Sequence, residues 1–274
     1  MRRIVLVALA VIAVALATDA FFIEPYDIEV THTVLMARVN APLKIAELTD
    51  LHTTKFGRLE KKLVDLLGQE KPDVIVITGD TLGRDSDYRA IRPLLQELHA
   101  PLGVWLVRGN WERNGIPRNE HGFYSSVGVH LLLNEAKPIR DDIWLVGVDD
   151  VITGNPDINI ALKSVPPDVY AIALFHEPAY FDQVAGRVPL ALAGHTHGGQ
   201  VRIPFVPVFW LPRGSNGFLE GWYAERNSKM YVSRGIGTSN LPVRFMCRPE
   251  LAIITLQPSQ SPSQPPIVPR EPSS

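Results

Sequence analysis

Apolar and polar positions follow two alternating patterns through the middle of the chain. Short apolar runs bounded by polar or glycine residues predict β-strands, and apolar residues at helical spacing predict helices between the early strands. Strands are expected at residues 44–48, 73–78, 103–107, 143–148, 169–175, 190–193, 229–233 and 251–256. One predicted helix presents Leu59, Leu63, Leu66 and Leu67 on one face, and the next presents Tyr88, Ile91, Leu94, Leu95 and Leu98.

This order of elements predicts an α/β fold. Helices alternate with strands at first and strands dominate later, which favours two packed sheets over one doubly wound sheet. We therefore expect a four-layer αββα sandwich of two mixed β-sheets flanked by helices. With 274 residues, of which 46% are hydrophobic, the chain can bury one sizeable core, so a single folded domain is expected over residues 43–257.

The first 23 residues differ from the rest of the chain. Met1-Arg2-Arg3 is cationic, residues 4–17 are apolar, and a second apolar patch covers residues 20–23. Counted to its end, the run reaches about 20 positions, which is enough to span a bilayer. The pattern predicts an uncleaved membrane anchor or, as the alternative, a signal segment cleaved after Ala15-Leu16-Ala17.

The cationic start also predicts an orientation in the membrane. Arg2 and Arg3 would stay in the cytoplasm, so the domain after the anchor is expected to be extracytoplasmic. Secretion after signal cleavage and attachment to the cytoplasmic face are the alternatives. Residues 24–42 are expected to connect the anchor to the domain, and the Pro/Ser-rich residues 258–274 are expected to form a disordered tail.

Charge and cysteine content narrow the classes of function. The formal net charge is −2, so no basic field favours a nucleic acid, and nucleic-acid binding is not expected. The single cysteine, Cys247, excludes an internal disulfide framework and cannot by itself form a thiolate metal site. No protein partner is inferred.

Polar side chains that can bind metal ions follow several of the predicted strands. They are Asp50, His52, Asp80, Asn110, His176, His195 and His197. Taken singly, each has an ordinary interpretation, such as a capping aspartate, a turn asparagine or a core histidine. Together, seven nitrogen and oxygen donors at strand ends are typical of a two-metal hydrolytic centre with open positions for a substrate oxygen.

With these motifs the chain resembles the calcineurin-like metallophosphoesterases from residue 44 to residue 256. The family pattern is present as Asp50/His52, Gly79/Asp80, Gly109/Asn110, His176 and Gly194/His195/His197. The resemblance implies that one divalent ion is held by Asp50, His52 and His197. It implies that a second ion is held by Asn110, His176 and His195, with Asp80 bridging the two.

The resemblance also implies a reaction. A hydroxide that bridges two ions of manganese, iron or zinc would attack a phosphoester, and Asp80, Asn110 and His195 would be the central catalytic residues. The rival hypothesis is a non-catalytic binding module that keeps the metals for stability and has lost activity.

Trp111 is the main departure from the family pattern. Similar proteins usually carry a histidine after the asparagine, and that histidine contacts the phosphate and assists the leaving group. Its absence disfavours phosphate monoesters and favours a phosphodiester, a pyrophosphate or a lipid phosphoester as the substrate. Trp111 is either a packing side chain at the rim of the site or a substrate-binding residue.

Other residues bear on the substrate and the membrane. Residues 233–245 and 248–250 further resemble a bacterial membrane-associated branch of the family, some members of which act on lipid phosphoesters. The proline-rich segment 201–213 predicts either a flap that enters the membrane interface or a loop packed on the domain. The aromatic residues of this segment are Phe205, Phe209 and Trp210. Arg234 and Arg244 are candidates for substrate phosphate contacts or for structural ion pairs.

Overall fold

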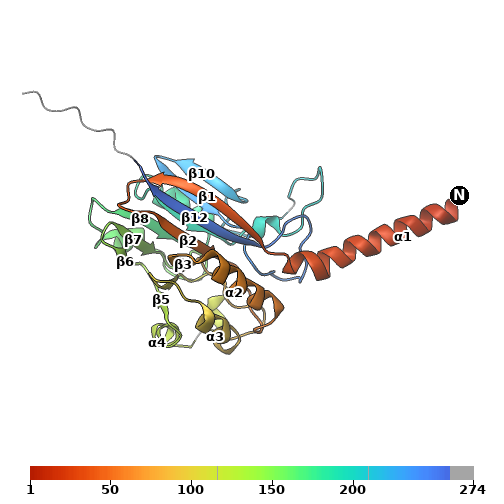
Figure 1. The fold of residues 1–274 in the computed structure, drawn as a ribbon, viewed down its shortest axis with the longest axis horizontal. Helices are drawn as coiled ribbons and strands as arrows, with labels where there is room; N and C mark the ends of the chain where they lie inside the picture. Colours follow the sequence, from red (N-terminus) through yellow and green to blue (C-terminus); the bar gives the residue numbers. More distant parts are fainter. Residues whose placement is uncertain (116, 209, 260–274) are drawn as a thin grey trace, which may run out of the picture.

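The computed structural model describes residues 1–115, 117–208 and 210–259, and two six-stranded sheets form its centre (Figure 1). In the first sheet the strand order is β1 (Glu29–Ala37), β12 (Glu250–Pro258), β2 (Leu43–Leu48), β3 (Val74–Ile77), β4 (Val104–Leu106) and β5 (Val129–Leu131). In the second sheet it is β10 (Gly221–Glu225), β11 (Ser228–Val232), β9 (Leu190–Ala193), β8 (Tyr170–Leu174), β7 (Ile143–Gly147) and β6 (Glu135–Arg140). Both sheets contain parallel and antiparallel pairs, so both are mixed.

Helices pack on both sheets. The first sheet carries α2 (Arg58–Glu70) and α3 (Tyr88–Glu97), and the second carries the short helices α5 (Ile158–Leu162) and α6 (Phe181–Val184). Helix α4 (Glu120–Ser125) contacts β5. Single helical turns lie at Glu24–Tyr26, Glu112–Asn114, Pro178–Tyr180 and His197–Gly199. The predicted α/β architecture of two mixed sheets with flanking helices is confirmed.

Strand β3 illustrates how the layers are held together. Ile75 and Ile77 belong to the core that contains α2 and α3, whereas Val74 and Val76 belong to the core between the sheets. All four side chains are fully buried, which explains why this strand is an unbroken apolar run. Burial of one such side chain contributes roughly 1.5–3 kcal/mol.

Four strands, β1, β5, β6 and β10, lie outside the predicted set. Strand β1 lies within residues 24–42 and pairs in parallel with β12 along its whole length. Residues 24–42 therefore contribute an edge strand to the first sheet and are more than a connection. Val34 and Met36 of this strand are more than half exposed, so β1 lacks the buried apolar run by which the central strands are recognised. Most of the expected tail, residues 260–274, lies outside the described residues.

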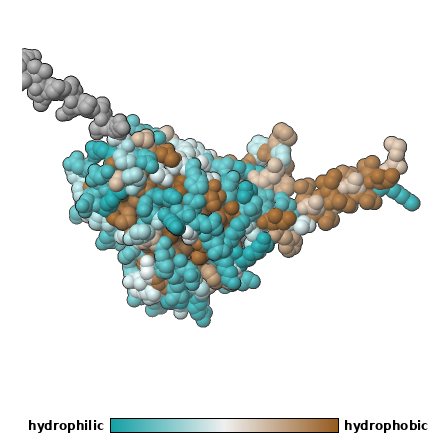
Figure 2. All heavy atoms as spheres, in the orientation of Figure 1, coloured by the Kyte–Doolittle hydropathy of each residue, from teal (hydrophilic) through white to brown (hydrophobic). Residues whose placement is uncertain are grey.

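The N-terminal apolar run forms helix α1 (Arg2–Thr18), which projects from the body of the molecule (Figure 1) and has a mostly apolar surface (Figure 2). A turn of π-helix at Asp19–Ile23 continues it. Within the described part of the chain, one helical stretch, Arg2–Tyr26, is long and apolar enough to cross a membrane. A signal sequence passes the same test.

The residues that follow α1 are attached to the domain by polar contacts. The buried carboxylate of Glu24 accepts hydrogen bonds from the backbone N–H groups of Met246, at 2.8 Å, and Cys247. The backbone N–H of Arg244 donates to the carbonyl of Ala20 at 3.0 Å. The end of the apolar helix is therefore fixed against the loop of residues 233–248.

Candidate metal centre

Three side chains that follow strands form a first ligand group. Asp50 and His52 follow β2, and His197 follows β9. The Nε2 atoms of His52 and His197 are 3.1 Å apart, and His197 Nε2 is 3.3 Å from Asp50 Oδ1. Two donors that each bind one cation at about 2.0–2.2 Å lie about 3 Å apart, so these distances suit ligands of a shared ion.

A second ligand group consists of Asp80, His176 and His195, which follow β3, β8 and β9. Nε2 of His176 is 3.2 Å from Asp80 Oδ2 and 3.1 Å from Nδ1 of His195. Asp80 Oδ2 is also 3.7 Å from Nε2 of His52 in the first group. The Asp80 carboxylate therefore lies between the two groups.

Two buried oxygen atoms support the presence of cations. In the portion of the chain that the structure describes, Asp50 Oδ1 and Asn110 Oδ1 are inaccessible to solvent and have no hydrogen-bond partner. An unsatisfied buried acceptor costs about 1–3 kcal/mol, and a bound cation would remove this cost. Carboxylate, amide and imidazole donors together suit divalent transition metals. The residues present thus fit two metal ions.

Backbone carbonyls orient three of the histidine rings. In each ring one nitrogen contacts a carbonyl and the other faces the ligand groups. The pairs are His52 with Leu82, His176 with Thr78 and His195 with Arg213, at 3.2, 2.8 and 2.8 Å. This arrangement fixes the orientation of rings that bind metals.

The protonation of these rings depends on burial and on the aspartates. Burial lowers the pKa of His52 and of His195 to about 4, so both rings are neutral at pH 7 and can act as ligands. Burial also disfavours the charged form of His176. The Asp80 carboxylate outweighs this effect and raises the pKa of His176 well above its usual value. Metal binding at the second group would therefore release a proton.

Five of the seven predicted ligands have a left-handed backbone conformation. Their φ angles are 50° at Asp50, 43° at His52, 52° at Asp80, 73° at His195 and 51° at His197. This conformation costs roughly 1–2 kcal/mol for a residue other than glycine, and it persists only where the surrounding structure enforces it. The sharp bends at the strand ends bring side chains from different strands together.

Two glycines allow the loops after β3 and β4 to approach each other. Gly79 has a φ of +94°, and a Cβ atom there would lie 2.6 Å from the backbone nitrogen of Gly109. A Cβ atom on Gly109 would collide with the Asp80 side chain. Glycine is therefore required at both positions if Asp80 is to reach the centre.

Glu112 holds the same two loops together. Its buried carboxylate accepts hydrogen bonds from the N–H groups of Gly109, Asp80 and Thr81, at 2.8, 3.1 and 2.5 Å, and from the Thr81 hydroxyl at 2.7 Å. Burial and the neighbouring Asp80 carboxylate raise the pKa of Glu112 to about 7. Glu112 is not among the expected site residues, although its position two residues after Asn110 is a signal that could have indicated this role.

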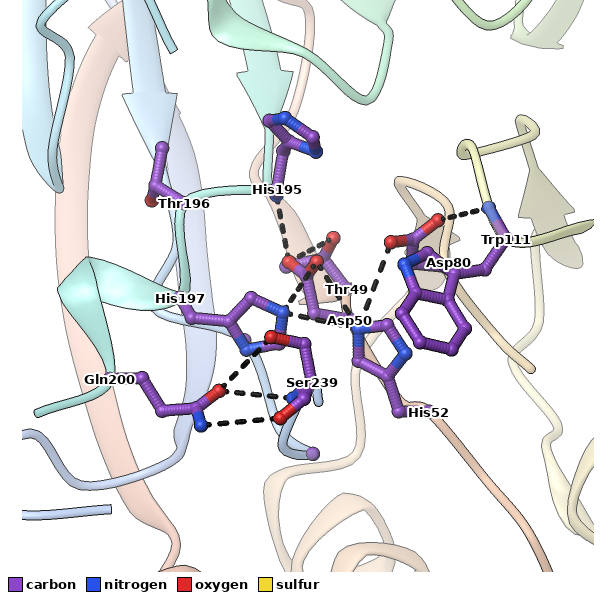
Figure 3. Close-up of polar contacts among 12 residues, drawn as sticks. Thr49, Asp50, His52, Asp80, Trp111, His195, Thr196, His197, Gln200 and Ser239 are labelled. Carbon is purple, nitrogen blue, oxygen red and sulfur yellow. Dashed lines mark hydrogen bonds and ion pairs between the residues drawn. The ribbon is translucent and has the colours of Figure 1, made fainter. Parts of the chain in front are cut away.

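Trp111 stands beside the first ligand group, next to both Asp80 and His52 (Figure 3). Its ring packs edge-on against the His52 ring, with the centroids 4.8 Å apart. Its backbone N–H donates to Asp80 Oδ1 at 2.9 Å. The side chain is half-buried and lines a cleft next to the centre, so it packs on a ligand and also borders open space.

Arg234 and Arg244, which are candidates for phosphate contacts or for structural ion pairs, are engaged within the fold, and these contacts support the structural alternative. Arg244 is fully buried, and its guanidinium donates to the backbone carbonyls of Arg234, Gly235, Gly237 and Cys247.

Arg234 instead forms ion pairs. It contacts Glu29 at 2.6 Å, Glu250 at 3.3 Å and Glu220 at 3.6 Å. Both arginines thus stabilise the fold, because backbone carbonyls of the same loop use the donors of Arg244 and three carboxylates use those of Arg234.

An apolar pocket of about 240 Å³ adjoins the first ligand group. It is lined by His197 and by a set of residues from two loops, namely Val201, Val208, Trp210, Leu241 and Val243. Gln200 joins these loops, because its side chain accepts from the backbone N–H of Ser239 at 3.0 Å (Figure 3). It also donates to the carbonyl of Leu241 at 3.1 Å. Phe205 lies on the surface with its side chain fully exposed, and Phe209 lies outside the described residues.

Comparison with known proteins finds relatives whose similarity to this protein covers most of the chain. The chain is 32% identical over 253 residues to the metallophosphoesterase YkuE of Bacillus subtilis (strain 168), covering 87% of this chain and 88% of the relative. It is 30% identical over 227 residues to the phosphodiesterase YaeI of Escherichia coli (strain K12), covering 79% and 83%. A transmembrane protein with a metallophosphoesterase domain from Bos taurus is 32% identical over 240 residues, covering 78% and 53%.

The family model for calcineurin-like phosphoesterases matches residues 43–199. This range contains all seven predicted ligands and both ligand groups of the structure. The chain therefore belongs to the calcineurin-like phosphoesterase family and is a metal-dependent phosphoester hydrolase.

Proposed function

We propose that the protein hydrolyses a phosphodiester, a pyrophosphate or a lipid phosphoester with the help of two divalent cations. The observation that carries this proposal is the position of the Asp80 carboxylate between two ligand groups, each with three donors within 4.8 Å of one another. When bound, manganese, iron or zinc ions would supply a bridging hydroxide as the nucleophile and would bind the phosphoryl oxygens.

The proposed ligands follow from the two groups. Asp50, His52 and His197 would hold one ion, and Asn110, His176 and His195 the other, with Asp80 shared. Among these, Asp80, Asn110 and His195 would be the central catalytic residues. The Oδ1 atom of Asn110, which has no hydrogen-bond partner in the described part of the chain, supports its place in this set.

Trp111 supports a substrate with a good leaving group. An indole ring packed against His52 cannot donate a proton to a leaving alkoxide in the way that a histidine can. Phosphate monoesters of simple alcohols are therefore the least favoured substrates.

The apolar features near the centre support a lipid phosphoester. The pocket beside His197 is mostly apolar, and a set of large apolar side chains around it and around the end of α1 is exposed. These side chains are Phe21, Phe22, Ile203, Phe205, Val206, Trp210, Leu241 and Met246. Such side chains are favourable at a membrane interface.

Membrane attachment through residues 1–23 is part of the same proposal, with the domain on the extracytoplasmic side because of Arg2 and Arg3. The exposed apolar surface of α1 supports an anchor. Cleavage after Ala17, followed by secretion, is the alternative.

A substrate panel tests the function. The full chain, purified in a nonionic detergent, would be assayed with added Mn²⁺ on a chromogenic monoester, a chromogenic diester, a pyrophosphate and a lipid phosphoester. We expect turnover of the diester, its loss on chelation and its recovery on adding Mn²⁺. Stoichiometric metal binding without turnover of any substrate would instead favour a non-catalytic binding module.

A further inference from the structure

A second cavity, a cleft of about 690 Å³, opens beside the candidate metal centre. It is bordered by His52 and Trp111 at the centre and by Phe22 and Tyr26 of the segment that follows α1. Three cationic side chains also line it, namely Lys55, Arg58 and Arg84. The cleft thus extends from the metal ligands to the base of the N-terminal helix.

These three cations are exposed, and none of them forms an ion pair with a carboxylate among residues 1–115, 117–208 and 210–259. Some other arginines of the domain are paired. Arg108 contacts Asp149 at 2.8 Å, and Arg202 contacts Glu220 at 2.7 Å. The cationic groups of the cleft therefore keep their charge available for a ligand.

Local contacts hold two of the three side chains in place. The guanidinium of Arg58 lies over the Tyr26 ring, 4.9 Å from its centroid. Nη2 of Arg84 donates to Asn240 Oδ1 at 2.8 Å, which joins the loop after β3 to the loop that separates the cleft from the apolar pocket. Each contact positions a guanidinium and leaves other N–H groups free to bind an anion.

The cleft has an excess of positive charge. Glu60 is the one acidic side chain among the described residues that line it, and its carboxylate accepts a hydrogen bond from the N–H of Gly57 at 2.9 Å. This contact caps the first turn of α2 and keeps Glu60 buried. Three cations against one capped carboxylate favour an anionic ligand in a partly enclosed space.

We propose that this cleft binds a second phosphate group of the substrate while the reacting phosphoester lies at the metal centre. The proposal rests on the proposed function, and it adds that the substrate carries two anionic groups. The second phosphate belongs either to a soluble part of the substrate or to a lipid headgroup at the membrane surface, and the experiment separates these sources.

The soluble arm uses two p-nitrophenyl phosphodiesters of butanediol, with the distal hydroxyl either free or phosphorylated. We expect the full chain with Mn²⁺ to favour the phosphorylated diester by about tenfold or more in kcat/KM, which corresponds to roughly 1.4 kcal/mol. The triple variant Lys55→Gln, Arg58→Gln, Arg84→Gln should lose this preference and keep its activity on the free-hydroxyl diester within about threefold.

A matched control variant removes the same charge elsewhere. Lys61→Gln, Lys163→Gln and Lys229→Gln change three exposed lysines that do not line the cleft. This control should keep the preference of the wild type. An equal loss of preference in both triple variants would overturn the proposal, because the effect would then come from net charge alone.

The lipid arm uses the full chain reconstituted in phosphatidylcholine vesicles with or without phosphatidylglycerol. If a lipid headgroup occupies the cleft, phosphatidylglycerol should inhibit hydrolysis of the free-hydroxyl diester by the wild type and by the control but not by the cleft variant. A cleft-dependent effect in either arm supports the proposal and identifies the source of the anion. If no cleft-dependent effect is found in either arm, the proposal is refuted.

A binding measurement separates this proposal from the proposed function. Calorimetry on the full chain compares butanediol bisphosphate with butanediol monophosphate and requires no turnover. If neither diester is hydrolysed but the bisphosphate binds more tightly through the cleft residues, the catalytic proposal fails and the cleft remains an anion site. Equal binding of both compounds would overturn the proposal that the cleft binds a phosphate group.

Discussion

Asp50, His52, Asp80, His195 and His197 are held in backbone conformations that cost free energy. Residues of this kind are retained where their side chains must converge, and here they form the two ligand groups. The buried oxygens Oδ1 of Asp50 and Asn110, which have no hydrogen-bond partner among the described residues, also support metal binding, because an isolated acceptor in a protein core is unfavourable unless a ligand satisfies it.

The first prediction concerns Asp80 and His195. Replacement by Asp80→Asn or His195→Ala should reduce kcat on a chromogenic diester to less than about one hundredth of the wild-type value, because each removes a ligand atom. His32→Ala, at an exposed position, is the matched control and should retain full activity. If either variant keeps activity within a few-fold of wild type and an unchanged circular dichroism spectrum, the ligand assignment is wrong.

The second prediction concerns Trp111. Trp111→His would place an imidazole where the indole now packs against His52, so it should raise the ratio of monoesterase to diesterase activity by about tenfold. Paired chromogenic substrates measure this ratio. Trp111→Phe keeps an aromatic ring without an acid and should leave the ratio unchanged. A ratio that does not move in the histidine variant would assign Trp111 to packing.

At the level of elements, the site is assembled at the carboxyl ends of strands from both sheets. Strands β2 and β3 of the first sheet and β8 and β9 of the second are each followed within three residues by a proposed ligand. Two further features hold the surrounding loops, namely the Glu112 carboxylate and the Arg244 guanidinium. Both are buried and both bind backbone groups, so they stabilise loop positions that no single strand could fix.

The third prediction tests the role of Arg244. Arg244→Met should destabilise the domain by about 3 kcal/mol or more, because several buried carbonyls would lose their donor. Urea unfolding followed by tryptophan fluorescence measures the change. The stability of Arg244→Lys should lie between that of the wild type and that of Arg244→Met, because a lysine ammonium offers fewer hydrogen-bond donors than a guanidinium and reaches less far. A variant that is as stable as wild type but weak in kcat/KM would restore the phosphate-contact hypothesis.

On the scale of the whole molecule, the apolar helix and the metal centre are linked through one region. Residues 20–26 contact the loop of residues 233–248 and also border the cleft at the centre. The segment 201–213 contributes to the apolar pocket beside His197 and carries exposed apolar side chains. Membrane attachment would therefore place the openings of the site near the lipid surface.

The fourth prediction joins the anchor to the exposed aromatic residues. Removal of residues 1–23 keeps Glu24 and its contacts, so it should release a soluble, metal-dependent hydrolase. In the full chain, Phe205→Ser with Trp210→Ser should lower activity on lipid vesicles at least about tenfold more than activity on a soluble diester.

Ile152→Ser with Ile160→Ser is the control for this prediction, because both isoleucines are exposed and line neither the apolar pocket nor the cleft. It should leave the ratio of vesicle to soluble activity unchanged. A parallel fall of both activities in the aromatic variant would indicate lost packing and would contradict an interfacial role. Mass spectrometry that finds the native chain cleaved after Ala17 would favour the secreted form.

Much of the fold and of the candidate site could be predicted from local sequence. Strands buried on both faces, such as β3 and β8, give unbroken apolar runs, and their ends mark where Asp80 and His176 must emerge. Edge strand β1 could not be recognised, because part of its surface is exposed and its pairing with β12 joins residues far apart in the chain.

The sequence by itself determined the donor types, their order and the apolar N-terminus, because these depend on residue chemistry and short-range spacing. Only the tertiary structure decided which charged residues remain free to act. Arg234 and Arg244 are used by carboxylates and carbonyls brought to them by the fold, whereas Lys55, Arg58 and Arg84 meet at one cleft without an acidic partner among the described residues. A side chain's availability depends on the groups packed around it, and the folding of the loops and sheets decides which groups those are.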